Sequence, residues 1–100
     1  MKLPEENRPI GHYGRLHREY LKQEHPAWYS SLILTGKLWT YLADLNEQAE
    51  ERLDLIIEQM KATEGVTEEL KARNQLEWVG RMNNIRNRAE EIIKSELIYI

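Results

Sequence analysis

The chain has 100 residues, of which 41% are hydrophobic and 31% are charged, a composition typical of one globular domain rather than of a disordered chain. It contains no cysteine, which excludes disulfides, thiolate metal sites and cysteine nucleophiles. The formal net charge of −3 argues against a protein that coats nucleic acid through charge alone.

The expected location follows from what the sequence lacks. No apolar run approaches the roughly 18 residues that a membrane span requires, and the first six residues lack the apolar stretch of a signal peptide. The lack of cysteine suits a reducing compartment. We therefore expect a cytoplasmic protein that does not associate with a membrane.

The first two segments are a lead-in and a short helix. Residues 1–12 contain two prolines and a glycine without apolar periodicity, which predicts an extended lead-in. Residues 13–24 are predicted to form a helix, because apolar side chains recur on one face. These side chains are Tyr13, Leu16, Tyr20 and Leu21. A helix this short is marginal alone, so we expect it to dock on a larger element.

A long helix is predicted over residues 26–63. His25 precedes Pro26, which ends the first helix and suits the first turn of the next. The stripe that follows with a 3-4 spacing is Trp28, Leu32, Thr35, Trp39, Leu42, Asn46, Ala49, Leu53, Ile56 and Met60. Glycine costs about 1 kcal/mol relative to alanine inside a helix. We expect a continuous helix here, and a bend or break at Gly36 is the alternative.

A turn and a third helix complete the chain. Gly65 is a candidate C′ glycine and Thr67 a candidate N-cap, followed by two glutamates that suit a helix start. The helix is predicted over residues 67–98. Its stripe is Leu70, Trp78, Met82, Ile85, Ala89, Ile92 and Ile93. Residues 97–100 are too apolar for a free tail, so they should pack.

These elements predict an all-α fold, a long antiparallel helical hairpin with a short N-terminal helix. A helix of about 35 residues is about 50 Å long, whereas a compact domain of this size has a radius of gyration near 13 Å. One short helix cannot cover both apolar stripes, so we expect a homodimer in a four-helix arrangement. The residues expected in this core or dimer interface are Trp28, Trp39, Leu42, Leu53, Ile56, Trp78, Met82 and Ile85.

A local basic surface is the candidate binding site. Residues 71–88 hold five basic side chains against one acidic, and residues 8–25 hold four against two. Arginines on such a surface meet phosphates, and asparagines reach base edges. The candidate nucleic-acid-binding residues are Arg15, Arg18, Arg73, Arg81, Asn84, Arg86 and Arg88. We favour the competing interpretation, an intrahelical ion-pair ladder through Glu77 and Glu91, because phosphate binding requires unpaired basic residues.

No metal site, cofactor or catalytic site is predicted. His12, His17 and His25 are spaced five and eight residues apart, which matches no helical metal motif. Two slender helices offer little concavity for a nucleophile and its base, so we expect no enzyme and no small-molecule substrate. Gly36 and Gly80 lie inside predicted helices, where glycine often marks the close approach of another backbone.

Three stretches in this order and spacing resemble the TnpV family, small proteins encoded on bacterial transposons. The stretches are 11–21 (Gly-His-Tyr-Gly-Arg-Leu-His-Arg-Glu-Tyr-Leu), 34–39 (Leu-Thr-Gly-Lys-Leu-Trp) with 42–45 (Leu-Ala-Asp-Leu), and 78–86 (Trp-Val-Gly-Arg-Met-Asn-Asn-Ile-Arg). The resemblance covers nearly the whole chain. Family members often have a further short segment ahead of the position of Met1, which leaves truncation of this chain open. The resemblance implies a genomic setting, and no site residues can be carried over from it.

The leading functional hypothesis is a non-enzymatic accessory protein of a bacterial mobile element. It would act as a dimeric helical module through contacts with a transposition protein. The alternative is a weak DNA- or RNA-binding accessory factor that uses the basic residues of the first and third predicted helices.

Overall fold

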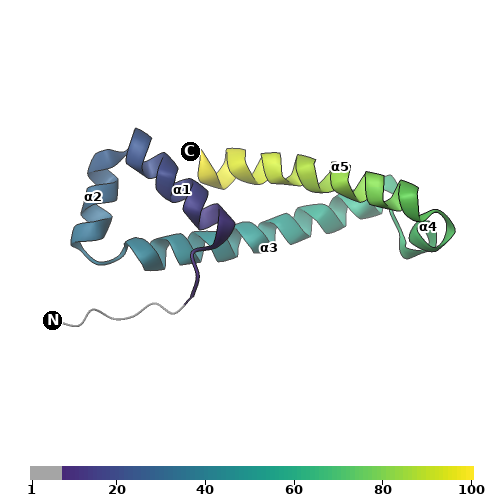
Figure 1. The fold of residues 1–100 in the computed structure, drawn as a ribbon, viewed down its shortest axis with the longest axis horizontal. Coiled ribbons are helices and arrows are strands. Elements are labelled where there is room, and N and C mark those ends of the chain that lie inside the picture. Colours follow the sequence, from purple (N-terminus) through teal and green to yellow (C-terminus); the bar gives the residue numbers. More distant parts are fainter. Residues whose placement is uncertain (1–7) are drawn as a thin grey trace.

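The structure is a computed structural model that describes residues 8–100. The described residues form helices and no strand, which confirms the all-α prediction (Figure 1). The elements are α1 (Gly11–Glu24), α2 (Pro26–Leu34), α3 (Leu38–Glu64), α4 (Glu68–Arg73), α5 (Gln75–Ile93) and the π-helical turn η1 (Lys94–Ile98). Of the lead-in predicted over residues 1–12, residues 1–7 lie outside the described residues. Residues 11 and 12 already belong to α1.

α1 crosses α3 at close range, as the docking of the short helix predicts. A Cβ atom on Gly14 would lie 2.9 Å from Ile10 Cβ and 3.1 Å from the carbonyl oxygen of Leu42, so any larger residue would require the two helices to shift. The Asn46 side chain, which interrupts the apolar stripe of α3, is buried and accepts a hydrogen bond of 3.2 Å from the Tyr13 backbone N–H. Asn46 therefore caps the start of α1 from another helix, because the first N–H groups of a helix lack intrahelical partners.

The continuous helix expected over residues 26–63 is wrong, because the chain breaks between α2 and α3. Gly36 takes a left-handed φ of 71°, and the Lys37 N–H donates to the Leu32 carbonyl oxygen at 3.0 Å. This pattern is a glycine C-cap, in which a left-handed residue lets later N–H groups satisfy the last carbonyls of a helix. Gly36 thus ends α2.

The predicted hairpin turn is confirmed. Gly65 has a left-handed φ of 69°, and the Val66 N–H donates to the Lys61 carbonyl oxygen at 2.9 Å. The Thr67 hydroxyl oxygen then accepts from the Leu70 N–H at 3.1 Å and caps α4. Beyond this turn α5 runs antiparallel to α3 (Figure 1).

The third predicted helix, over residues 67–98, is also interrupted. Asn74 leaves the helical conformation, and its side-chain oxygen accepts from the Glu77 N–H at 3.2 Å. This asparagine caps a new helix, a role that its polar side chain favours over the helix interior. α4 is therefore a separate short helix. Its Lys71 Nζ lies 4.7 Å from the centre of the Trp78 ring in α5.

The hydrophobic core follows the seam between α3 and α5 and is closed at one end by α1 and η1. Its buried members include Tyr13, Leu53, Ile56, Ile85, Ala89, Ile93 and Ile98. Of the predicted core or interface residues, Leu42, Leu53, Ile56 and Ile85 are buried, and Trp78 and Met82 are partly buried against the core. Trp28 and Trp39 are 44% and 45% exposed, so they lie outside the core of one chain.

Gly80 lies in open space among the described residues. A Cβ atom on Gly80 would find nothing within 4 Å among the described residues, so the predicted backbone approach is wrong for the single chain. The structure extends over 59 × 27 × 18 Å, with a radius of gyration of 17.5 Å. A compact domain of this length has about 13 Å, so the molecule is the elongated hairpin that the helix lengths predict.

Candidate functional site

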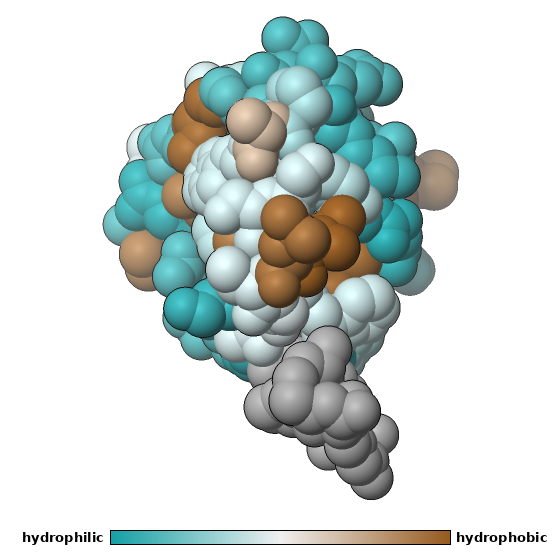
Figure 2. Space-filling model, turned by 90° about the vertical axis from the view of Figure 1, so that its left-hand side faces the viewer, coloured by the Kyte–Doolittle hydropathy of each residue, from teal (hydrophilic) through white to brown (hydrophobic). Residues whose placement is uncertain are grey.

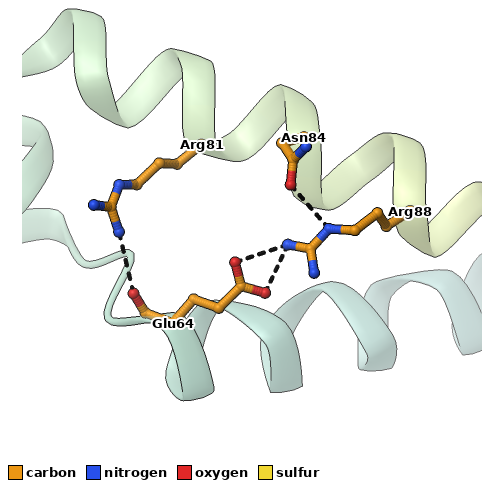
Figure 3. Close-up of polar contacts among 4 residues, drawn as sticks. All are labelled: Glu64, Arg81, Asn84 and Arg88. Carbon is orange, nitrogen blue, oxygen red and sulfur yellow. Dashed lines mark hydrogen bonds and ion pairs between the residues drawn. The ribbon is translucent and has the colours of Figure 1, made fainter.

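Two arginines of the predicted basic surface, Arg81 and Arg88 of α5, both contact one acidic residue, Glu64, at the end of α3 (Figure 3). Arg88 donates from Nη2 to both carboxylate oxygens of Glu64 at 2.6 and 2.7 Å, and from Nε to Asn84 Oδ1 at 2.9 Å. Arg81 Nη1 lies 3.4 Å from the Glu64 carbonyl oxygen. Three candidate nucleic-acid-binding residues, Arg81, Asn84 and Arg88, therefore lie together, and their polar groups form hydrogen bonds within the chain.

One ion pair of the expected intrahelical ladder is formed in α5, and another is not. Arg81 Nη2 lies 2.9 Å from the Glu77 carboxylate, one turn earlier in α5, as predicted. Arg88 pairs with Glu64 across the hairpin and not with Glu91 in its own helix. The antiparallel packing causes this difference, because it places the end of α3 beside the middle of α5.

The remaining predicted arginines do not join this group. Arg18 Nε is buried and lies 3.9 Å from the Glu19 carboxylate. Arg15, Arg73 and Arg86 are exposed, and none forms an ion pair with another residue of the described range 8–100. They come from α1, α4 and α5, and α1 and α4 lie at opposite ends of the hairpin (Figure 1). The basic residues are thus distributed over the molecule.

His17 is a core residue that joins three parts of the chain. Its side chain is fully buried, with Nδ1 2.7 Å from the Ile98 carbonyl oxygen and Nε2 2.9 Å from the Tyr41 hydroxyl. A carbonyl oxygen only accepts, so Nδ1 carries the proton, and Nε2 is free to accept from Tyr41. Burial lowers the pKa of His17 below its ordinary value of 6.5, which favours this neutral form.

The histidines do not assemble a metal site. Within residues 8–100, no group of three histidine, cysteine, aspartate or glutamate side chains is placed to hold an ion. His12 and His25 are exposed, and their rings contact neighbouring aromatic rings of Tyr13, Tyr20 and Trp28.

A shallow groove of about 340 Å³ runs between α3 and α5. Its lining residues are Arg52, Ile56, Gln59, Met60, Thr63, Glu64, Ile92 and Glu96. The apolar strip in the middle is bounded by two ion pairs across the hairpin, Arg52–Glu96 at 3.1 Å and Arg88–Glu64 at 2.6 Å. Each acidic side chain of the groove is held by an arginine.

An exposed apolar surface lies at the end of the hairpin where α2 is found. None of the nine residues of α2 is buried, although the helix contains no charged side chain. Ile33 and Leu34 are 50% and 86% exposed. Figure 2 looks onto this end of the molecule and shows a compact hydrophobic patch facing the viewer.

Sequence reasoning missed three structural residues, Asn46, His17 and Asn74. The Asn-x-x-Glu pattern of 74–77 is a capping signal visible in the sequence. Asn46 is visible only as a polar interruption in an apolar stripe, and its partner Tyr13 lies 33 positions away. His17 carries no local signal, because Ile98 is 81 positions away.

No helix in the described part of the chain is both long and apolar enough to cross a membrane. The chain matches no curated protein and no solved structure. The family model described as "Transposon-encoded protein TnpV" matches residues 1–98, nearly the full length of the chain. The resemblance carried by the three sequence stretches is thereby confirmed, and the protein belongs to the TnpV family of transposon-encoded proteins.

Proposed function

We propose that this protein is a non-enzymatic accessory factor of a bacterial transposon, acting in the cytoplasm as a homodimer through contacts with a transposition protein. The observation that carries the proposal is the uncovered apolar surface of α2, on an elongated chain whose α5 arginines Arg81 and Arg88 are engaged by acidic groups. Exposed apolar patches of this kind mark contact surfaces for other macromolecules. The groove between α3 and α5 offers a second place for a partner side chain to pack.

Light scattering coupled to size exclusion tests the homodimer. At about 20 μM, the expected mass is twice the chain mass of 11.9 kDa. A single-chain mass at that concentration would remove the dimer from the proposal.

A genetic experiment tests the accessory role. The frequency of excision of the element is compared between host cells with the intact gene and cells with an early stop codon in it. The proposal expects a changed frequency that is restored by a plasmid copy. An unchanged frequency would contradict it.

A nucleic-acid-binding role is the second candidate, favoured by the exposed and unpaired state of Arg15, Arg73 and Arg86 within the described range. A mobility-shift titration with duplex DNA and RNA at about 50 and 200 mM salt separates the two roles, because phosphate contacts weaken steeply with salt. Binding that fades with salt supports this candidate, and the absence of a shift at the lower concentration removes it.

A further inference from the structure

α2 is a helix whose outer side is left exposed by the described residues 8–100. A helix on the surface of a globular protein turns an apolar stripe inward and a polar face outward, whereas a helix that is apolar all round is normally buried. α2 has apolar side chains on all sides, yet none of its residues is buried. It packs on α1 and on the start of α3, so its outer side requires another partner.

The uncovered area matches the requirement of a dimer. Four large apolar side chains at this end are 44% (Trp28), 50% (Ile33), 86% (Leu34) and 45% (Trp39) exposed. At about 200 Å² for each large side chain, they leave roughly 450 Å² of apolar surface open to water. An interface of standard size takes about 800 Å² from each chain, a little over half of it apolar, which is again roughly 450 Å².

The charges flanking α2 identify a second copy of this chain as the partner. Residues 26–36 carry no charge, Glu24 comes just before the helix, and Lys37 comes just after it. Both side chains are exposed, and neither forms an ion pair with a residue in the described range. α2 has nine residues, about 13 Å, so two antiparallel copies place each end of one helix beside the opposite end of the other.

We propose that α2 forms the interface of the homodimer, with the two α2 helices packed antiparallel across a twofold axis. Glu24 of each chain then faces Lys37 of the other, and the two Leu34 side chains are buried in the contact, one toward each end of it. The arrangement is isologous, so the same patch covers itself and the assembly closes at two chains. This inference rests on the homodimer of the proposed function and specifies its surface.

A matched pair of leucine substitutions tests the location. Leu34 and Leu76 are 86% and 87% exposed, but Leu76 begins α5 at the other end of the hairpin. Leu34→Glu should raise the dissociation constant of the dimer at least about 30-fold, because it buries an unpaired charge in the apolar contact at two symmetry-related places. Leu76→Glu should leave the dissociation constant unchanged. Circular dichroism and thermal melting check that both variants fold.

A charge reversal tests the antiparallel orientation. Glu24→Lys or Lys37→Glu alone should each raise the dissociation constant about three- to tenfold, because opposite charges become like charges at both ends of the interface. The double variant Glu24→Lys with Lys37→Glu should recover the wild-type value. Two single effects that simply add in the double variant would overturn the antiparallel pairing.

The outcomes separate this inference from the proposed function. A wild-type dimer that persists in Leu34→Glu, or that dissociates in Leu76→Glu, overturns the α2 interface and leaves the homodimer standing. A monomeric wild type overturns both. Flotation with vesicles of phosphatidylcholine and phosphatidylglycerol is run in parallel. Binding that is lost in Leu34→Glu, by a protein that is monomeric in solution, would assign the patch to a lipid surface instead.

Discussion

His17 lies between α1, α3 and η1 in its neutral form. A water-exposed histidine does not stay neutral at low pH. Burial lowers its pKa, against the opposing effect of the hydrogen bond to the Ile98 carbonyl oxygen. The unfolded chain, with the ordinary pKa of 6.5, therefore takes up the proton first as the pH falls. The stability that neutral His17 provides is complete above that pH and is lost as the pH drops through the lower, folded-state pKa.

We predict that the free energy of unfolding falls between pH 8 and pH 5, and that His17→Gln reduces this fall. Urea unfolding at several pH values measures it. His12→Gln, at an exposed ring, is the control and should keep the wild-type pH dependence. At pH 8, His17→Gln should cost about 1–3 kcal/mol, because partner groups in the core lose their hydrogen bonds. An identical pH dependence in wild type and His17→Gln would refute the assignment.

Asn46 is the second residue whose role depends on distant packing. Its buried side-chain oxygen accepts from the Tyr13 N–H, so Asn46→Ala should destabilise the protein by about 1–2 kcal/mol, the usual effect of losing a helix cap. Asn83→Ala, at an exposed position of α5, should change stability by less than about 0.5 kcal/mol. Thermal melting of both variants measures the difference, and equal melting temperatures would show that the cap contributes nothing.

Residue roles of this kind could not be predicted from the sequence. Asn46 stands out as a polar residue in an apolar stripe, but the stripe does not reveal the hydrogen-bond partner of its side chain. The burial of Tyr13 could be predicted, because helical periodicity alone places its side chain on the inner face. The hydrogen bonds of His17 depend on where η1 ends, which is decided by packing of the whole hairpin.

At the scale of elements, the helical segments could be predicted well and their interruptions less well. Gly65 and Thr67, two positions apart, combine two strong local signals, and the turn lies where predicted. Gly36 provides one signal within a continuing apolar stripe, and the glycine C-cap ends α2 although the stripe continues. Asn74 caps α5 within a stripe of the same kind, because a side-chain cap competes successfully with helix continuation.

Two glycine-to-alanine substitutions should have opposite effects. Gly36→Ala places a side chain on a left-handed residue and should destabilise the protein by about 1–2 kcal/mol. Gly80→Ala should stabilise it by about 0.5–1 kcal/mol, because Gly80 lies inside α5 with open space around it. Urea unfolding measures both changes. A stabilising Gly36→Ala would mean that α2 and α3 join into the single helix that the sequence predicts.

At the scale of the whole molecule, two ion pairs hold the arms of the hairpin together beyond the apolar seam. Arg52–Glu96 joins α3 to η1 and Arg88–Glu64 joins α3 to α5, and the two pairs lie on either side of the same groove. The sequence predicted the antiparallel arms but not these pairs, because helical spacing compares residues only within one helix. Arg88 is paired with Glu64 and Arg81 with Glu77, so α5 carries fewer unpaired arginines than its composition suggests.

The Arg88–Glu64 pair permits a test of how much the arms depend on this contact. Both side chains are partly exposed, at 45% and 37%, so a double-mutant cycle with Glu64→Gln and Arg88→Gln should give a coupling free energy of about 0.5–1 kcal/mol. In about 1 M salt the coupling should shrink, because the screening length falls to about 3 Å. The control cycle uses Glu58 and Lys61, an ion pair of 3.3 Å within α3, where the coupling should stay below about 0.5 kcal/mol. A cycle at Glu64 and Arg88 that gives no more than this control would show that the seam alone keeps α3 and α5 side by side.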